Sequence, residues 1–245
     1  MAGEYCPLVP TVLAPAKLTV SLRMTGLRDD GYHLIDAEMV SLDLHDTLEI
    51  EDGGSGVEIV GPAGSEHLGA DDDNLVTRAL ALCDRRAHVR LHKAIPAGAG
   101  LGGGSSDAAA VLRWAGFDDE VAAATIGADV AFCLRGGRAR VRGIGEIVEP
   151  LPFVARTYTL LTPPIMCSTP AVYAAWDQLG GPEGDHGNDL EPAALAVAPD
   201  LVRWRDELAE SSGERPRLAG SGSTWFVEGA FPGDGRVVAE TVPAE

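Results

Sequence analysis

The stretch IPAGAGLGGGSSDAAAVL, residues 95–112, places five glycines among residues 98–104 and continues into two serines, an aspartate and an alanine-rich segment. Glycine loses more conformational freedom on folding than any other residue, so a fixed glycine run needs a reason. Glycines tolerate positive φ, which lets successive backbone N–H groups point into one concavity. A helix that begins at Ser105 or Ser106 with a serine cap adds a partial positive charge. The run is predicted to bind an anion, most often a phosphate.

Other kinds of glycine-rich segment fit the run less well. A flexible linker would not lie between Pro96 and a capped helix. The pattern GxxxxGK[ST] is absent because no lysine follows the glycines. GAGLGG (98–103) matches GxGxxG, but a dinucleotide-binding fold also needs an acidic residue at the end of the next strand, about 20 residues on. The acidic residues near that distance, 118–120, begin a helix pattern instead.

The composition is that of a globular chain with an acidic surface. The 245 residues are 45% hydrophobic, enough for the core of one large domain or two closely packed ones. Nineteen basic residues against 37 acidic ones give a net charge of −18, which repels nucleic acid and anionic lipid. The apolar runs are too short for a membrane helix, and the N-terminus lacks the pattern of a signal peptide. We expect a cytoplasmic protein that binds neither nucleic acid nor membrane.

The cysteines and histidines give no metal pattern. The four cysteines, Cys6, Cys83, Cys133 and Cys167, form no CxxC pair, which argues against a thiolate zinc site and favours free thiols in a reducing compartment. His88 and His92 would meet on a helix, but their segment alternates like a strand and has no third ligand nearby.

Hydrophobic periodicity predicts strands and helices in mixed order. Without strict alternation of strand and helix, the order favours the α+β class over a doubly wound sheet. A change in composition after EPLPF (149–153) suggests two parts, 1–155 and 156–245. Strands are expected at 17–24, 40–51, 56–61, 88–96 and 156–164, with a hairpin over 130–143 and a strand–turn–strand over 215–229. Helices are expected at 74–87 after an Asp73 cap, from the serine pair to Gly116, and at 118–127, 168–181 and 199–211.

The glycine run resembles the phosphate-binding motif PxGxGLGGGSSDAA of the GHMP kinase superfamily. Further blocks narrow the resemblance to the 4-diphosphocytidyl-2-C-methyl-D-erythritol kinases, and they follow in the family's order over nearly the whole chain. They are APAKLTVSLRMTGLRDDGYHLI (14–35), DDDNLVTRA (71–79), IGADVAF (126–132), STPAVY (168–173), NDLEP (188–192) and AGSGSTWF (219–226).

The resemblance implies a two-domain α+β fold. Its N-terminal half, 1–155, would resemble the second domain of ribosomal protein S5 and bind ATP, and its C-terminal half, 156–245, would be ferredoxin-like. It also implies ATP-dependent phosphorylation of the 2-hydroxyl of 4-diphosphocytidyl-2-C-methyl-D-erythritol, a step of the non-mevalonate isoprenoid pathway. Mg²⁺ would arrive with ATP and need no protein metal site, and the chain would be a monomer or a weak homodimer.

By the same resemblance, Asp129 is the catalytic aspartate and Lys17 is the lysine that pairs with it and polarises the hydroxyl. Without the family context, Asp129 reads as a turn residue and Lys17 as a solvated strand end. A cation close to Asp129 would also keep its carboxyl ionised.

The nucleotide would be held by the glycine run and by a residue near the adenosine. Asn74 matches the latter position and is otherwise an ordinary residue at a helix start. Asp107 is either a first-turn acid favoured by the helix dipole or a residue near Mg²⁺. The expected ATP-binding residues are Asn74, Pro96, Ala97, Gly98, Ala99, Gly100, Leu101, Gly102, Gly103, Gly104, Ser105 and Ser106.

The substrate would be held by Tyr32 and His33, which match the residues around the cytosine, and by Thr169 and Tyr173, the latter at the opposite aromatic wall. Stacking on a tyrosine ring suits a pyrimidine base. The family asparagine two positions after the lysine is Thr19 here. Thr19 leaves open a GHMP kinase for a different small alcohol, although DGYH with NDLEP argues against it. A non-catalytic nucleotide-binding relative is a separate alternative, and the presence of both Lys17 and Asp129 argues against it.

Overall fold

Two antiparallel-rich sheets of different size organise the molecule, which is a computed structural model that describes residues 9–61 and 74–244. The larger sheet has the order β3-β4-β2-β5-β6, with β1 paired to β2. The smaller sheet has the order β10-β7-β9-β8. The mixture of helices and sheets confirms the predicted α+β class.

The larger sheet is built on a long hairpin. β1 (Thr11–Leu27) and β2 (His33–Asp52) pair antiparallel along nearly their whole length, with irregularities in register between Pro15 and Lys17 and at two later points. β4 (Ala87–His92) and β5 (Arg138–Gly143) both pair with the edge of β2 opposite β1, β4 near the C-terminal end of β2 and β5 near its N-terminal end. β3 (Gly56–Val60) runs parallel to β4, and β6 (Ile147–Pro150), which periodicity missed, pairs with β5.

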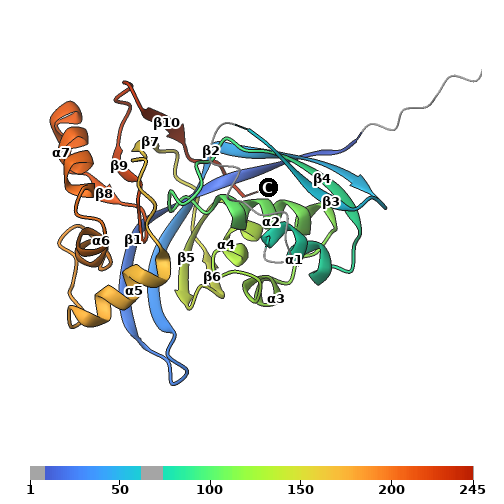
Figure 1. The fold of residues 1–245 in the computed structure, drawn as a ribbon, viewed down its shortest axis with the longest axis horizontal. Helices are drawn as coiled ribbons and strands as arrows, with labels where there is room; N and C mark the ends of the chain where they lie inside the picture. Colours follow the sequence, from blue (N-terminus) through green and yellow to red (C-terminus); the bar gives the residue numbers. More distant parts are fainter. Residues whose placement is uncertain (1–8, 62–73, 245) are drawn as a thin grey trace, which may run out of the picture.

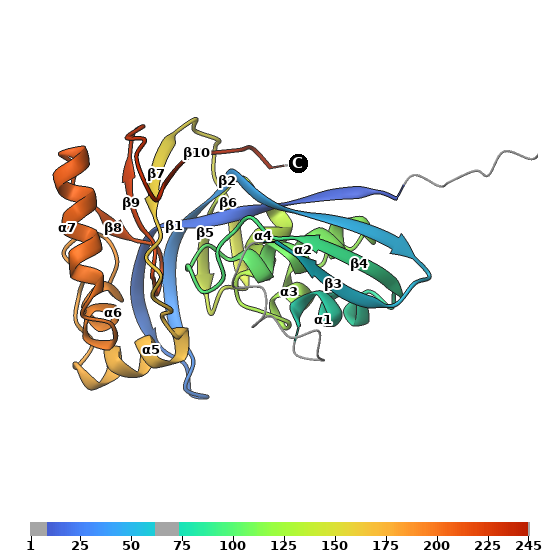
Figure 2. The same cartoon turned by 45° about the horizontal axis from the view of Figure 1, so that its top comes forward.

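Four helices pack against the larger sheet, and their buried faces contribute to the main hydrophobic core. They are α1 (Leu75–Leu82), α2 (Gly103–Trp114), α3 (Glu120–Ala124) and α4 (Val130–Arg135). In both ribbon views these helices lie on one side of the β1–β2 hairpin, and the helices of the C-terminal half lie at the opposite end of the molecule (Figures 1 and 2).

The smaller sheet consists of β7 (Thr157–Leu161), β8 (Arg217–Leu218), β9 (Trp225–Glu228) and β10 (Arg236–Glu240). The helices α5 (Thr169–Gln178), α6 (Glu191–Val197) and α7 (Leu201–Ser212) belong to this half. The change of sheet falls between the end of β6 and the start of β7, although the division at residue 155 stays a prediction. A second core cluster joins Leu18 of β1 to Tyr158 of β7 and Phe226 of β9, so the two sheets are packed together.

Three local predictions were wrong. Residues 130–143 form α4 followed by β5 instead of a hairpin, because Val130 through Cys133 are all buried and a short apolar run suits a buried helix as well as a strand. The helix expected at 74–87 ends at Leu82, and its cap is Asn74, whose side chain accepts a hydrogen bond from the Val76 amide at 2.9 Å. The expected cap Asp73 lies outside the described residues.

The third correction concerns the helix after the glycine run. α2 begins at Gly103, not at Ser105 or Ser106, and its cap is Gly102 in the left-handed region with φ +68°. The Ser106 amide already donates to the Gly102 carbonyl at 2.8 Å, so both serines lie inside the first turn. Glycine at 102 turns the chain into the helix early, with no capping side chain.

Candidate active site

The glycine run forms one wall of a cavity of about 380 Å³. All ten residues from Pro96 to Ser105 line it, together with Asp129, Thr169, Tyr173 and Ser221 from other parts of the chain. The first N–H groups of a helix have no acceptor within the helix, and here these belong to Gly103, Gly104 and Ser105 on the cavity wall. The wall therefore presents backbone donors and the positive end of the α2 dipole.

Two buried side chains and two backbone hydrogen bonds hold the glycine run in place. Ala99 and Leu101 are buried in the core cluster between the sheets. The Leu101 carbonyl accepts from the Lys17 amide at 3.0 Å, and the Ala99 carbonyl accepts from the Thr224 amide at 3.1 Å. The run is thus connected to β1 on one side and to the 219–224 loop on the other, so its conformation is set by both halves of the molecule.

Close approach explains why glycine is needed at two of these positions. A Cβ on Gly100, where φ is +77°, would lie 2.6 Å from the Gly222 carbonyl oxygen. A Cβ on Gly102 would lie 2.6 Å from Cγ of Lys17. Real Cβ atoms do not approach other atoms this closely, and the backbone of the 219–224 loop cannot move as easily as a side-chain end.

Lys17 and Asp129 meet at the edge of this cavity. The Nζ atom of Lys17 lies 3.0 Å from Oδ2 of Asp129. The Lys17 side chain is 7% exposed and that of Asp129 is 30% exposed, so the carboxylate is the member of the pair that solvent or a ligand can reach. Lys17 Nζ also donates to Oγ1 of Thr19 at 3.1 Å. The expected pairing of these two residues is therefore present.

Asp129 is positioned by the start of α4, where it occupies the cap position. Lys17 is positioned by β1, beside the register irregularity that follows Pro15. Glycine at 127 suits the close packing of the chain before α4, because a Cβ there would lie 3.2 Å from Cγ2 of Val130. Two distant segments thus bring a cation and a carboxylate into direct contact.

Not every expected ATP contact lies on the cavity wall. The Ser106 hydroxyl donates to the Pro15 carbonyl at 2.6 Å and its amide donates within α2, so both donors are used inside the protein. Ser106 is 1% exposed and supports the run from below. Asn74 caps α1 with its side-chain oxygen and is likewise outside the cavity lining. Neither arrangement supports a direct contact with ATP.

Asp107, the acidic residue that follows the two serines, is paired with a lysine, which neither interpretation of the sequence predicted. Asp107 is the fifth residue of α2, and its carboxylate Oδ2 lies 2.6 Å from Nζ of Lys93. Lys93 also pairs with Asp46, which accepts from the Ile95 amide at 2.8 Å. The first-turn interpretation of Asp107 was therefore wrong, and Asp107 does not line the cavity.

This buried cluster of Asp46, Lys93 and Asp107 lies directly beneath the glycine run, since a Cβ on Gly103 would be 3.3 Å from Lys93 Nζ. One lysine faces two carboxylates. Burial and the negative charge of Asp46 raise the pKa of Asp107 to about 7, although Lys93 opposes the shift. The same two carboxylates raise the pKa of Lys93 against the effect of burial. Lys93 itself lines the cavity, which its lone position in a strand pattern did not indicate.

The residues expected around the substrate base form a partly aromatic cluster. The His33 ring lies 5.0 Å from the Tyr173 ring and 5.6 Å from the Trp176 ring. Nε2 of His33 lies 2.8 Å from Oδ1 of Asp177. Burial, followed by the charge of Asp129, raises the pKa of Tyr173 to about 12, so its phenol stays protonated at neutral pH. Trp176 and Asp177 were missed, since periodicity alone assigns them to an ordinary helix.

Tyr32 and Thr169 lie apart from this cluster. Tyr32 is 58% exposed, and the Arg28 guanidinium lies 5.3 Å from its ring centre. Thr169 lines the cavity and its Oγ1 is 2.9 Å from Oγ of Ser221, in the 219–224 loop. Asn188 supports this loop by donating to the Leu218 and Gly220 carbonyls at 2.9 and 2.7 Å. The NDLEP and AGSGSTWF blocks therefore contribute to the same corner of the cavity.

The described residues contain no group of three or more His, Cys, Asp or Glu side chains arranged to hold a metal ion. Cys83, Cys133 and Cys167 are free thiols, and Cys6 lies outside the described residues. Among the helices that the structure describes, none is long and apolar enough to cross a membrane.

Comparisons with known proteins place the chain among characterised sequences. A family model described as the GHMP kinases N terminal domain matches residues 74–137. A 4-diphosphocytidyl-2-C-methyl-D-erythritol kinase of Paracoccus denitrificans is 38% identical over 90% of this chain and 87% of its own length. One of Granulibacter bethesdensis is 37% identical over 95% of this chain and 89% of its own.

Solved structures show the same relationship. A crystal structure of 4-(cytidine 5′-diphospho)-2C-methyl-D-erythritol kinase superposes with a TM-score of 0.73 and 31% identity, covering 95% of this chain and 99% of that chain. Homoserine kinase from Cytophaga hutchinsonii superposes with a TM-score of 0.63 over 100% of this chain and 98% of that one. Its identity is only 18%, so this second likeness concerns the fold alone.

Proposed function

The chain belongs to the 4-diphosphocytidyl-2-C-methyl-D-erythritol kinase family of GHMP kinases, and we propose that it transfers the terminal phosphoryl group of ATP to the 2-hydroxyl of 4-diphosphocytidyl-2-C-methyl-D-erythritol. The observation that best supports this reaction is the 3.0 Å contact between Lys17 and Asp129 at the edge of the glycine-lined cavity. Phosphoryl transfer needs positioning, charge stabilisation and an acceptor for the hydroxyl proton, and this arrangement offers all three.

The backbone of the glycine run would bind the phosphates of ATP. Donors fixed in advance toward an anion lose little freedom when it binds, and the dipole of α2 favours negative charge at the same point. The buried contacts of Ala99 and Leu101 keep the run in this conformation. Ser105, at the end of the lining segment, would add a hydroxyl contact.

Asp129 would act as the general base that accepts the proton of the substrate hydroxyl. Its carboxylate is the more exposed member of the pair and lines the cavity. Lys17, held by Asp129 and by Thr19, would stabilise the negative charge on the attacking oxygen. Magnesium carried by ATP would neutralise part of the phosphate charge, and Asp129 and Ser105 are among the residues of the cavity wall whose oxygen atoms could coordinate it.

The cytidine base would be held by the aromatic cluster of His33, Tyr173 and Trp176. Tyr173 borders both this cluster and the cavity, which supports a substrate that spans the two. Tyr32 would have to turn from its exposed position beside Arg28 to stack on a base. Asp177 would orient the His33 ring through its hydrogen bond.

A second candidate is a GHMP kinase reaction on a different small alcohol. Thr19 supports this candidate, because it stands where the family has an asparagine. Thr19 is 2% exposed, and its hydroxyl accepts a hydrogen bond from Lys17. Release of ADP, coupled to an optical readout and measured with a panel of alcohols, tests the two. Turnover that requires the cytidine diphosphate substrate supports the first proposal. Turnover with homoserine, mevalonate or a sugar alone refutes it in favour of the second.

We also propose that the protein works in the cytoplasm as a monomer or weak homodimer. Its free thiols suit a reducing compartment. Size-exclusion chromatography with light scattering across a range of concentrations checks the oligomeric state, and a stable tetramer would contradict it.

A further inference from the structure

His33, the first residue of β2, is enclosed by three side chains of α5. Its ring lies 5.0 Å from that of Tyr173 and 5.6 Å from that of Trp176, and its Nε2 atom lies 2.8 Å from Oδ1 of Asp177. The His33 side chain is 12% exposed, against 53% for Asp177. Both ribbon views show α5 beside the β1–β2 hairpin (Figures 1 and 2). One helix therefore sets the place of this imidazole.

The orientation of the His33 ring is fixed as well. A half-turn of the ring would put a carbon atom in place of Nε2 and lose the hydrogen bond to Asp177. Trp176, which packs edge-on to the ring at 87°, is itself held, because its Nε1–H donates to the Pro182 carbonyl at 3.0 Å. Nδ1 of His33 has no hydrogen-bond partner among residues 9–61 and 74–244, so it is the ring nitrogen left for a ligand.

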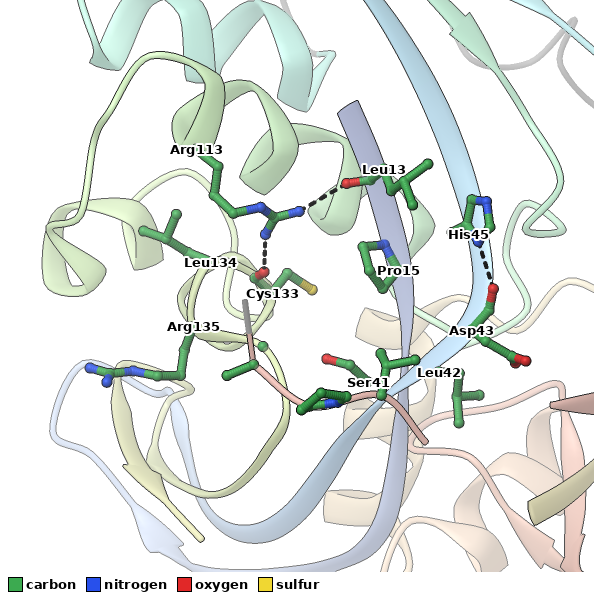
Figure 3. Close-up of a pocket in the computed structure, with 14 residues that line it drawn as sticks. Leu13, Pro15, Ser41, Leu42, Asp43, His45, Arg113, Cys133, Leu134 and Arg135 are labelled. Atoms are coloured by element: carbon green, nitrogen blue, oxygen red, sulfur yellow. Dashed lines mark hydrogen bonds between the residues drawn. The ribbon is translucent and has the colours of Figure 1, made fainter. Parts of the chain in front are cut away.

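The partner of one ring nitrogen decides which nitrogen of a neutral imidazole carries the proton. An ionised carboxylate accepts hydrogen bonds and donates none, so the bond to Asp177 requires the proton on Nε2 of His33 and leaves Nδ1 as an acceptor. His45 obeys the same rule with the opposite result. It lies on the wall of a second cavity, of about 410 Å³, where its Nδ1 is 2.6 Å from the Asp43 carbonyl and must carry the proton (Figure 3).

An acceptor at Nδ1 distinguishes the two pyrimidine bases of ribonucleotides. Cytosine carries an amino group at C4, which donates hydrogen bonds, whereas uracil carries a carbonyl oxygen at that position, which only accepts. A carbonyl oxygen that meets Nδ1 leaves both acceptors unpaired in a largely buried place, and this costs binding free energy.

From this geometry we propose that Asp177 is a positioning residue that makes the site selective for cytosine over uracil. It holds the proton on Nε2 of His33, and Nδ1 then accepts a hydrogen bond from the amino group of the base. This role rests on the proposed function, because the cluster of His33, Tyr173 and Trp176 is there the place of the base. Asp177 acts through His33 and needs no contact with the substrate.

Nitrogen NMR tests the position of the proton without any substrate. Proton–nitrogen correlation spectra of the full chain with isotope-labelled histidine, recorded at about pH 8, distinguish the two neutral tautomers. The signals of His33 are identified by their loss in His33→Gln. The tautomer with the proton on Nε2 is expected in the unaltered protein, and a mixture in Asp177→Asn, because an amide both donates and accepts. A proton on Nδ1 in the unaltered protein, or no change in the variant, would overturn the proposal.

Calorimetric titration with CDP and UDP measures the selectivity. Saturating ADP with magnesium blocks the glycine run, so that the pyrimidine nucleotides report on the aromatic cluster. The unaltered chain is expected to bind CDP at least about tenfold more tightly than UDP. In Asp177→Asn the ratio is expected to fall to within about threefold, because the second tautomer offers uracil a donor. A purely structural role would weaken both nucleotides together and leave the ratio unchanged, which would overturn the proposal.

Glu49→Gln is the matched control for Asp177→Asn. Oε1 of Glu49 lies 3.2 Å from Nε2 of His92, which is also a histidine–carboxylate pair, and neither residue lines the cavity of the glycine run. This variant is expected to keep the ratio of the unaltered chain, and an equal fall in the ratio would overturn the assignment to Asp177. Failure of both CDP and UDP to bind would refute the cytidine site of the proposed function and this role with it. A preference for CDP that survives Asp177→Asn would refute the role of Asp177 alone.

Discussion

Replacing Gly102 by alanine should damage catalysis through Lys17, and Gly104→Ala in the same run is the matched control. Gly102 has φ +68°, and a Cβ there would lie 2.6 Å from Cγ of Lys17. Gly104 lies in helical conformation, and its Cβ would find only Leu75 at 3.7 Å, an ordinary contact. The two changes add the same methyl group two residues apart in very different surroundings.

The magnitudes follow from these distances. The left-handed conformation costs an alanine about 1–2 kcal/mol. Carbon atoms prefer separations of about 3.5–4.0 Å, so the Lys17 side chain must move by about 1 Å. A misplacement of that size near the reacting groups lowers turnover by up to about a hundredfold. Gly104→Ala instead raises helix propensity and stabilises the fold by about 0.5–1 kcal/mol.

The assay combines two measurements on both variants. Urea unfolding gives the change in free energy, and ADP release at saturating ATP and substrate gives kcat. The expected pattern for Gly102→Ala is a modest loss of stability with a fall in kcat of about tenfold to a hundredfold. The reasoning is refuted if kcat of Gly102→Ala stays within about twofold of that of Gly104→Ala, since the methyl group would then have left Lys17 in place.

Three further changes test other parts of the site. Asp129→Asn should lower kcat by about 10²–10⁴-fold, measured by ADP release, and leave the affinity for ADP almost unchanged, measured by nucleotide titration. A parallel loss of kcat and of ADP affinity would argue against a role of Asp129 as the base. Asn188→Ala should lower the free energy of unfolding by about 2–4 kcal/mol, because the buried Leu218 and Gly220 carbonyls lose their donors, and urea unfolding with no loss would contradict this support of the loop. The pKa of Asp107 is raised to about 7 in the folded protein, above its unfolded value of about 4. The folded state therefore binds a proton more tightly than the unfolded state. The stability that this proton contributes is complete below pH 4 and is lost as pH rises to about 7. Asp107→Asn should remove this decline, on the order of 4 kcal/mol at most, from a series of unfolding curves between pH 4 and pH 8, and an identical pH dependence in both proteins would show that Asp107 is ionised throughout.

Local sequence rules predicted the strands whose hydrophobic residues alternate along the chain. The alternation in residues 17–24 and 40–51 identified the two strands of the long hairpin, although not their full length. The start of α2 was missed, because cap preferences favour serine, whereas here a glycine with positive φ begins the helix. α4 was misread because four consecutive buried residues satisfy the pattern of a strand and of a helix equally well.

The residues of the candidate site also divide into those that the sequence identifies and those that only tertiary packing brings together. The glycine run was recognisable from its composition, and the pairing of Lys17 with Asp129 came from the resemblance to a family, since no local rule connects residues so far apart. The cluster of Asp46, Lys93 and Asp107 joins three segments with nothing in common except their place beneath the run. Such convergence depends on tertiary packing and leaves no signal in the spacing of the residues.

The charges of the cavity explain why the run is made of glycine. The charged side chains that line it are Lys93 and Asp129, and each is already paired, with Asp46 and Asp107 in one case and with Lys17 in the other. Side-chain charge therefore contributes little attraction for a polyanion in a chain of net charge −18. The attraction must come from backbone donors and the α2 dipole, which act only over the first turn of the helix. Donors of such short range require the phosphates to approach the backbone closely, and bulky side chains along the run would prevent that approach.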